Sequence, residues 1–165
     1  MSTNSYILFF DSKKSPTSFE GVYHHWDGYP SGVGKKLHEL YNTFFNKNVQ
    51  AMKQTLVDEN PAGWSNIIEN WNDPKNGPVS YTMKGEPSNI IRFNSLKNLS
   101  ADFGIQFIYI IDIRTKNMYI ITNDDKLRGF IVSLEMAVPK KTWNNLDEDD
   151  ATEYLPISTF TELNC

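Results

Sequence analysis

Residues 6–10, Tyr-Ile-Leu-Phe-Phe, form the first apolar run of the chain, and polar residues bound it on both sides. Because this run is short and consists of aliphatic and aromatic side chains, it predicts a buried strand. Lys, Ser and Pro fill much of residues 11–18, which is typical of a turn. Residues 19–26 predict a second strand, paired as a hairpin with the first.

The hydrophobic period changes after residues 27–34, a loop dense in Gly and Pro. Apolar residues then recur every three or four positions, so the pattern predicts an amphipathic helix with Ser31 as its N-cap. A second helix is expected over residues 49–60, and a third, shorter helix over residues 64–71. The first helical stripe consists of Val33, Leu37, Leu40, Tyr41, Phe44 and Phe45.

The second half of the chain has the pattern of strands. Residues 105–113 include the unbroken run Phe-Ile-Tyr-Ile-Ile, which predicts a central strand covered on both faces. Short polar turns precede two further predicted strands, at residues 118–122 and 128–134. Residues 72–89 predict a long connection with a short strand at residues 79–83. The tail predicts mostly loop, with one short helix over residues 158–163.

These elements predict a single α+β domain that spans residues 1–165. We expect an antiparallel sheet built from both halves of the chain, covered on one face by two or three helices that lie between residues 33 and 71. A chain of 165 residues buries roughly two-thirds of its unfolded surface, which suffices for independent folding. Exposed edge strands leave a homodimer open.

Composition and charge narrow the class of protein. Hydrophobic residues make up 39% of the chain and aromatic residues 13%, which indicates a folded globular protein. The formal net charge is −4 and the pI is about 5.3, so non-specific nucleic-acid binding through a broad basic face is not expected. The acidic run at residues 147–150 is interpreted as a solvated loop, because its spacing does not match a calcium-binding loop.

The sequence also indicates an intracellular location. No apolar run approaches the ~18 residues that cross a bilayer, and no basic stretch precedes the first apolar run, so neither a membrane span nor a signal peptide is expected. The single cysteine, Cys165, excludes a disulfide framework and a cysteine-based zinc site. We therefore expect a cytoplasmic protein without a metal or a cofactor.

Residues 23–36 concentrate the candidate chemistry between a strand and a helix. Their glycines let the backbone approach a ligand closely, and a helix N-terminus offers unpaired N–H groups that suit an anion. Trp26 and Tyr29 can stack on a planar group, while Lys35 and Lys36 add positive charge. The glycine spacing matches neither a Walker A loop nor a dinucleotide-binding loop. In the alternative interpretation, the segment is an ordered turn in which Trp26 and Tyr29 fill the helix–sheet seam.

Two adjacent histidines raise an enzymatic alternative. His24 and His25 point to opposite faces of a strand, so they do not readily bind one metal ion. One of them could combine with Asp27 and His38 for proton transfer in a small hydrolase or transferase. The sequence has no nucleophile elbow, and its one cysteine is the last residue, so a standard nucleophile is absent.

The run Tyr23-x-x-Trp26-Asp27-Gly28-Tyr29-Pro30-Ser31-Gly32-x-Gly34 resembles the signature of a family of small, largely uncharacterised bacterial and phage proteins. Members of this family also carry a later Tyr-x-Tyr-x-Ile-Asp segment, and residues 107–112, Phe-Ile-Tyr-Ile-Ile-Asp, lie in the matching place. The family often begins Met-Gly-Thr-Arg-Ser, whereas this chain begins Met-Ser-Thr-Asn-Ser and lacks the arginine. The resemblance implies a microbial or phage source and an intracellular protein, and it implies no established activity.

We therefore expect a phage or bacterial accessory protein that binds its partner without catalysis. The predicted ligand is a small anionic, nucleotide-like molecule or a host protein, held by the Trp-Asp-Gly-Tyr-Pro loop and the following helix N-terminus. On this hypothesis Trp26→Ala unfolds the protein, whereas Lys35→Ala with Lys36→Ala abolishes binding and leaves folding intact. The predicted binding residues are His24, His25, Trp26, Asp27, Tyr29, Ser31, Gly32, Gly34, Lys35 and Lys36.

Overall fold

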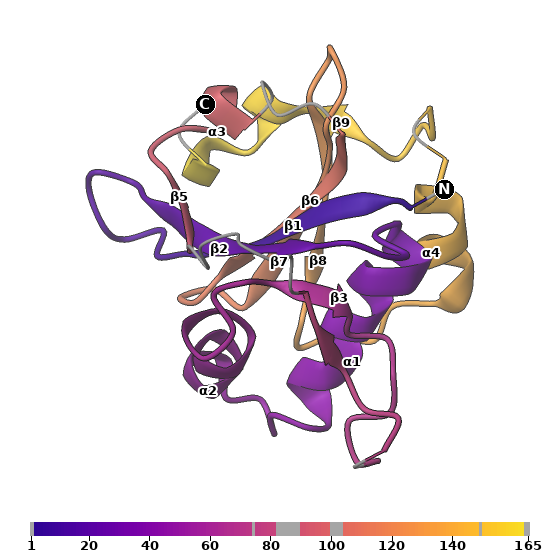
Figure 1. Ribbon diagram of the computed structural model, residues 1–165. Helices are drawn as coiled ribbons and strands as arrows, with labels where there is room; N and C mark the ends of the chain where they lie inside the picture. Colours follow the sequence, from indigo (N-terminus) through magenta and orange to yellow (C-terminus); the bar gives the residue numbers. More distant parts are fainter. Residues whose placement is uncertain (1, 74, 82–89, 100–103, 149, 164–165) are drawn as a thin grey trace.

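The computed structural model describes residues 2–73, 75–81, 90–99, 104–148 and 150–163 (Figure 1). Nine strands of these residues form one sheet in the order β4-β3-β2-β1-β6-β7-β8-β9, and β5 pairs with β2 on the same edge as β3. The strands are β1 (Asn4–Phe10), β2 (Phe19–His24), β3 (Trp64–Asn66), β4 (Val79–Ser80), β5 (Ile91–Phe93), β6 (Ile105–Asp112), β7 (Asn117–Thr122), β8 (Arg128–Ser133) and β9 (Leu155–Pro156).

Helices and helical turns accompany the sheet within these described residues. A π-helical turn, Pro30–Gly34, leads into the first α-helix, and a second one, Gln54–Asp58, continues the next α-helix. Two 3₁₀ turns, Ile157–Thr159 and Thr161–Leu163, lie near the C-terminus. The mixture of helix and strand confirms the α+β class in its coarse form. The α-helices are α1 (Lys35–Asn42), α2 (Val49–Lys53), α3 (Leu96–Leu99) and α4 (Lys140–Leu146).

The sheet is mixed, so the prediction of a purely antiparallel sheet is wrong. β1 pairs in parallel with β6 along its whole length, and β2 pairs in parallel with β3 where His24 lies opposite Trp64. The remaining ladders are antiparallel. Parallel strands need a long crossover, which the residues between β1 and β6 supply. The predicted contribution of both chain halves is confirmed, because β1 and β2 lie beside β6, β7 and β8.

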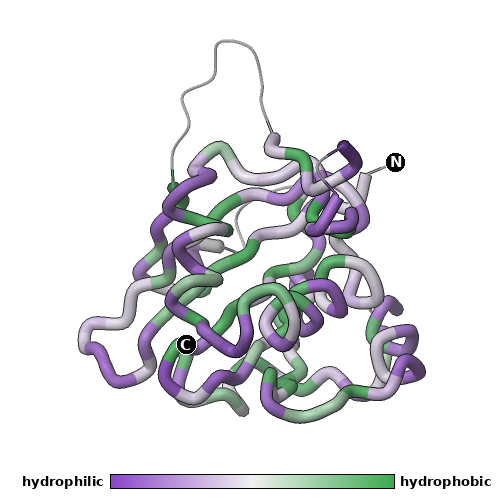
Figure 2. The backbone as a smooth tube through the Cα atoms, turned by 90° about the horizontal axis from the view of Figure 1, so that it is seen from below, coloured by the Kyte–Doolittle hydropathy of each residue, from purple (hydrophilic) through white to green (hydrophobic). Residues whose placement is uncertain are grey.

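Both faces of the sheet are covered, so the prediction of cover on one face is also wrong. Ile7 and Phe9 of β1 pack in one cluster with residues of α1, α2 and α4, whereas Leu8 and Phe10 pack with α3 and the C-terminal turns (Figure 1). Since successive side chains of a strand alternate between faces, an unbroken apolar run needs cover on both sides. Figure 2 shows hydrophobic positions along the inner strands and hydrophilic positions in the outer turns.

Three local elements differ from their sequence-based predictions. Residues 64–71 form β3 and turns instead of a helix, because β3 joins the edge of β2 and the Trp64 indole N–H donates to the Leu56 carbonyl oxygen. Ser31 lies within the π-helical turn rather than at its N-cap, which is Tyr29. The tail contains α4, which buries Trp143, where the sequence predicts a loop.

Several predicted elements are shorter than expected. β4 covers only the first two residues of the predicted strand 79–83, and residues 82–83 lie outside the described residues. The helix predicted at residues 158–163 is a pair of 3₁₀ turns. The edge strands β4 and β9 have two residues each and β5 has three. Such short edges offer little backbone to a second copy, so the homodimer stays a prediction.

The loop after β2 is fastened to the centre of the sheet by Tyr109. Its hydroxyl donates to the Gly28 carbonyl oxygen over 2.5 Å, and the Gly28 N–H donates to the Thr3 carbonyl oxygen over 2.8 Å. Burial raises the pKa of Tyr109 well above its usual value, so the hydroxyl keeps its proton. A Cβ atom at Gly34 would lie 3.0 Å from the Tyr109 ring, so glycine permits this close approach. The two stretches that carry the family resemblance therefore contact each other.

We expect Tyr109→Phe to lower the free energy of unfolding by roughly 1–3 kcal/mol, because it removes the hydrogen-bond partner of the carbonyl oxygen of buried Gly28. Urea unfolding followed by circular dichroism measures this loss. Tyr29→Phe is the matched control, since its hydroxyl bond to Asp27 is part-buried and 3.2 Å long. The control should lose less than about 0.5 kcal/mol, and equal losses in the two variants would contradict this role of Tyr109.

Candidate functional site

The ten predicted binding residues do not form one site in the structure. They lie along the bend between β2 and α1 (Figure 1), but their surroundings differ. One histidine is in the core, the other belongs to a surface group of rings, and Tyr29 borders a cavity beside α4. Lys36 lies in a separate groove along α1. The side chains predicted to bind one ligand therefore lie in several separate environments.

The bend itself is held by its own backbone. Asp27 has a positive φ of 53°, a conformation that Asp and Asn adopt more readily than most residues. Its carbonyl oxygen accepts the Val33 N–H at 3.1 Å, and its carboxylate accepts the Tyr29 hydroxyl at 3.2 Å. A Cβ atom at Gly32 would lie 2.2 Å from the Asp27 carbonyl oxygen, so this position requires glycine. These contacts support the interpretation of the segment as an ordered turn.

A carboxylate from the chain itself occupies the helix start that the sequence suggests for an anion. The two oxygens of Asp147, directly after α4, accept the Ser31 backbone N–H at 2.8 Å and the Ser31 hydroxyl at 2.6 Å. Helix N-termini attract negative charge because their first N–H groups lack partners and the helix dipole is positive there. A free anion at this place would have to displace Asp147, which is a structural residue rather than part of a solvated loop.

His24 lies in the core, where solvent does not reach its side chain. Its Nε2 accepts the backbone N–H of Ile67 at 3.0 Å, so the neutral ring carries its proton on Nδ1. Burial, with a smaller effect from neighbouring His25, lowers the pKa of His24 to about 3. The ring is therefore neutral at physiological pH and serves to join β2 to the residues after β3.

The second histidine belongs to a surface group of rings that we name the aromatic cluster: Tyr23, His25, Trp26 and Tyr81. His25 stacks on Tyr81 with ring centres 5.2 Å apart, meets Trp26 edge-to-face at 4.7 Å, and bonds the Tyr23 hydroxyl through Nδ1 at 2.6 Å. Burial raises the pKa of Tyr23 to about 12. Trp26 is 46% exposed, because its backbone pairs with Ser65 at the sheet edge. Its predicted place in the helix–sheet seam is therefore wrong.

The remaining predicted groups point to different partners. Lys35 is exposed, whereas the Lys36 side chain is only 11% exposed. His38, the third member of the enzymatic alternative, bonds a backbone carbonyl through Nε2 at 2.7 Å. Among the described residues, the structure gives no hydrogen bond that joins Asp27 or His38 to either His24 or His25. The geometry therefore offers little support for acid–base catalysis by these groups.

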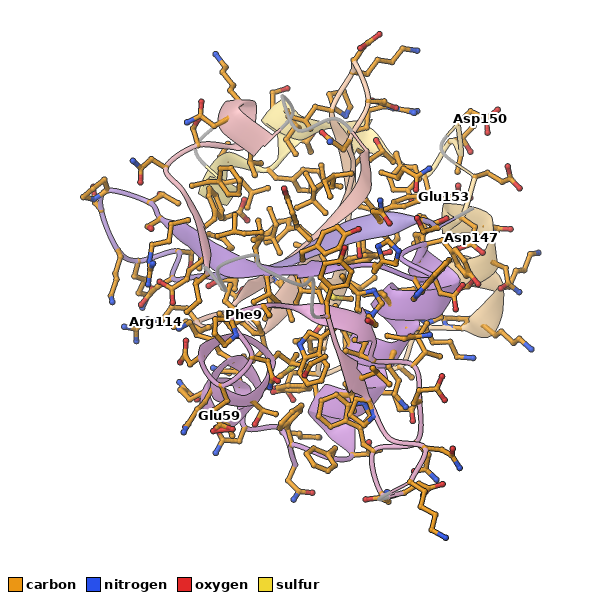
Figure 3. All side chains as sticks on the ribbon, viewed as in Figure 1. Phe9, Glu59, Arg114, Asp147, Asp150 and Glu153 are labelled. Atoms are coloured by element: carbon orange, nitrogen blue, oxygen red, sulfur yellow. The ribbon has the colours of Figure 1, made fainter. Side chains whose placement is uncertain are left out.

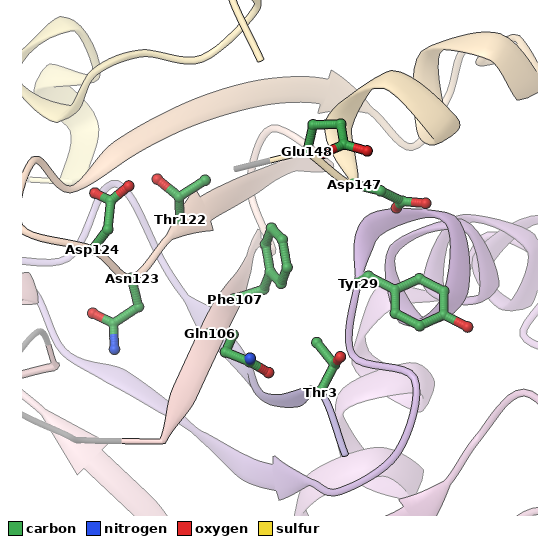
Figure 4. A pocket seen from close by; sticks show the side chains of 9 residues that line it. All are labelled: Thr3, Tyr29, Gln106, Phe107, Thr122, Asn123, Asp124, Asp147 and Glu148. Atoms are coloured by element: carbon green, nitrogen blue, oxygen red, sulfur yellow. The ribbon is translucent and has the colours of Figure 1, made fainter. Parts of the chain in front are cut away.

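A cavity of about 490 Å³ opens beside the bend, and Tyr29 forms part of its wall (Figure 4). We name it the acidic cavity, because Asp124, Asp147 and Glu148 line it and none of its described lining residues is Lys, Arg or His. Asp124 pairs with Arg128 over 3.1 Å, which lies outside the lining. Figure 3 shows further carboxylates, those of Asp150 and Glu153, on the same side of the molecule as Asp147. The lining of the cavity is therefore suited to positive charge.

The acidic cavity is not visible in the sequence, because its lining comes from segments that are far apart. Thr3 precedes β1, Gln106 and Phe107 begin β6, and Thr122 ends β7. The acidic run at residues 147–150 and Tyr29 are its two signals in the sequence. The fold brings these two features together, because Ser31, two residues after Tyr29, donates a hydrogen bond to Asp147, which lies 116 positions further along the chain.

Comparison with protein-family models, with curated proteins and with solved structures gives no match. The family resemblance noted in the sequence therefore stays a prediction. No helix in the described part of the chain is both long and apolar enough to cross a membrane. Over the same residues, no group of three or more His, Cys, Asp or Glu side chains is placed to hold a metal ion.

We expect stability to fall in mildly acidic solution because of His24. Its folded pKa of about 3 lies below the ordinary value of 6.5, so between these values the unfolded chain binds a proton that the folded protein does not. The free energy of unfolding therefore has its full value, as far as His24 is concerned, above pH 6.5. It decreases as the pH falls from 6.5 toward 3, because the unfolded chain gains the proton. At pH 5.5 the loss is about 1.4 kcal/mol, which urea unfolding at pH 7.5 and pH 5.5 measures.

His25→Gln is the matched control for this pH dependence, since it removes the half-buried neighbour and leaves the buried His24 ring in place. The control should keep the loss, whereas His24→Gln should abolish it. If His24→Gln does not fold, the ring signals of His24 in NMR spectra of the parent protein decide the matter. A His24 ring that titrates between pH 7.5 and pH 5.5 would contradict the prediction.

Proposed function

We propose that the protein binds a small ligand without catalysing a reaction on it, and that the ligand carries positively charged or hydrogen-bond-donating groups. The acidic cavity is the proposed binding site. Its lining carries the proposal, since three carboxylates and two aromatic rings, Tyr29 and Phe107, surround one hollow beside the bend. The proposed location is the cytoplasm, which would be that of a host cell if a phage encodes the protein.

The charges of the lining favour a cation over an anion. Asp147 and Glu148 carry formal negative charge at neutral pH, and no described basic residue of the lining offsets them. Two unit charges at 4 Å interact by about 4 kcal/mol at the effective dielectric constant of roughly 20 that applies near a protein surface. An ammonium or guanidinium group is therefore attracted and a phosphate repelled. The acidic cavity therefore does not suit the anionic ligand that the sequence suggests, whereas a separate groove lined by Lys36 offers a positive charge.

The walls of the cavity suit a small molecule of mixed polarity. Its volume of about 490 Å³ falls in the range of small-molecule sites, roughly 300–1,000 Å³. The rings of Tyr29 and Phe107 offer faces for a cation or an apolar body. Gln106 and Thr122 add an amide and a hydroxyl. Since Tyr29 belongs to the bend, the proposal connects the bend to ligand binding.

We expect small organic cations to bind the parent protein more tightly than small aliphatic anions do. Agmatine and spermidine are suitable probes, with citrate and succinate as anionic comparisons that lack an aromatic ring, in isothermal titration calorimetry. Glu148→Gln should weaken agmatine binding roughly two- to fivefold, because it removes one exposed carboxylate from the lining. Glu59→Gln, the same change of charge at an exposed position on the opposite side of the molecule, should leave the affinity unchanged. Equal weakening in both variants, or no binding of either cation, would contradict the proposal.

A second candidate function is the recognition of another protein through the aromatic cluster. Trp26 is 46% exposed, yet its ring is fixed by an edge-to-face contact with His25, which in turn stacks on Tyr81. Rigid Trp and Tyr side chains are typical of the residues that contribute most to protein interfaces. The net charge of −4 favours a basic partner, for example one that presents arginine to the Trp26 ring.

We expect Trp26→Ala to leave the protein folded, with a loss of less than about 1 kcal/mol in the free energy of unfolding, because nearly half of the residue is already exposed to water. This outcome is opposite to the unfolding that the sequence suggests. Urea unfolding measures it, and sedimentation velocity of parent and variant tests whether a second copy of this chain is the partner. A variant that is unfolded at neutral pH would show that Trp26 serves the fold rather than recognition.

A further inference from the structure

We infer that the groove along α1 is a second binding site, for a small aromatic molecule that carries an anionic group. We name it the Lys36 groove. It has a volume of about 360 Å³ and lies between α1, the residues directly after α1 and residues 70–72. This inference goes beyond the proposed function and does not rest on it, since the two hollows share no described lining residue.

The first support is an ammonium group with a poor partner. The Lys36 side chain is only 11% exposed, and its Nζ lies 3.5 Å from the Glu39 carboxylate, at the limit of a hydrogen bond. The Glu39 side chain is 54% exposed, so water screens the pair. The pair is itself exposed to solvent, and Glu39 also lines the groove. A bound carboxylate or phosphate would displace Glu39 and give the ammonium a closer partner.

The second support is a fixed aromatic wall beside this charge. The rings of Phe44 and Trp71 meet edge-to-face with centres 5.0 Å apart, and Phe44 is 42% exposed although it is apolar. The Trp71 indole N–H donates to the Ile67 carbonyl oxygen at 2.8 Å, and Trp64 packs against the same ring at 5.6 Å. The wall is therefore held in place before a ligand arrives, which lowers the entropic cost of binding.

The third support is a pair of side-chain amides on the same groove. Asn70 and Asn72 both line it. The Oδ1 of Asn70 accepts the Asn72 backbone N–H at 3.0 Å, which orients the Asn70 side chain and leaves its NH₂ group as a donor. A cation, amide donors and an aromatic wall together match an aromatic ring with an attached carboxylate or phosphate. The prediction that Lys36 binds an anion is thus supported by the groove that its side chain lines, and not by the backbone N–H groups near Ser31, where Asp147 is bound.

Isothermal titration calorimetry with matched probes tests this site. AMP and indole-3-acetate combine a ring with a phosphate or a carboxylate, whereas adenosine has the ring alone and inorganic phosphate the charge alone. We expect at least one of the two combined probes to bind about tenfold more tightly than adenosine and phosphate. The probe that binds more tightly identifies the anionic group that the groove prefers.

Variants then place the binding in the Lys36 groove. Lys36→Gln should weaken the better probe about tenfold, whereas Lys36→Arg, which keeps the charge, should stay within about threefold of the parent. Lys35→Gln is the matched control, since it removes an exposed charge from the neighbouring position and should change nothing. Phe44→Ala should weaken binding about fivefold or more through lost stacking. Circular dichroism confirms that each variant is folded.

The outcomes separate this site from the acidic cavity. Lys36→Gln should leave agmatine affinity unchanged, and Glu148→Gln should leave the affinity for the aromatic anion unchanged. The inference is overturned if neither combined probe binds, if adenosine binds as tightly as AMP and indole-3-acetate, or if Lys35→Gln weakens binding as much as Lys36→Gln. Because the probe comparison uses the parent protein, it decides the matter even if a variant fails to fold.

Discussion

β1 is buried on both of its faces, and the two layers of the protein pack against it. Ile7 and Phe9 contact the layer of α1, α2 and α4, while Leu8 and Phe10 contact the layer of α3 and the C-terminal turns. β2 and β6 are its two neighbours in the sheet. The bend that leaves β2 therefore reaches Tyr109 of β6, which fixes its position. Burial of one hydrophobic strand in this way determines where the candidate sites lie.

α1 separates two kinds of chemistry. In the π-helical turn that leads into α1, the Ser31 N–H donates to the carboxylate of Asp147, which also lines the acidic cavity. About one turn further along, Lys36 lines the groove between α1 and residues 70–72, which exposed Phe44 also lines. The Asp147 side chain, directly after α4, thus occupies the helix start, which by itself attracts anions, and adds negative charge to the cavity beside it. The chain then offers positive charge on a different surface of the same helix.

Local patterns in the sequence predicted most of the strands and the two hairpins, β1 with β2 and β6 with β7, but not the pairing of β1 with β6 that joins them. The apolar run of residues 107–111 is long enough to require cover on both faces, and the structure confirms that cover. The parallel pairing of this run with β1 depends on contacts about 100 residues apart, which periodicity does not contain. For Trp26 and Asp147, too, the local sequence does not determine which contacts the side chain makes. A tryptophan can fill a seam or lie at a sheet edge, and an aspartate in an acidic run can be solvated or cap a helix, so only tertiary structure decides between them.

The hydrogen bonds between Ser31 and Asp147 span 116 residues, which affects how the nascent chain matures. Ribosomes add roughly 5–20 residues per second, so roughly 5–25 s separate the synthesis of these two partners. For the first part of this interval, until residues 105–112 have been made, β1 and β2 lack β6, and the cover that α4 and the C-terminal turns give to β1 is still missing. This topology therefore requires the β1–β2 hairpin to stay partly collapsed, or to be protected by a chaperone, until its later partners have been synthesised.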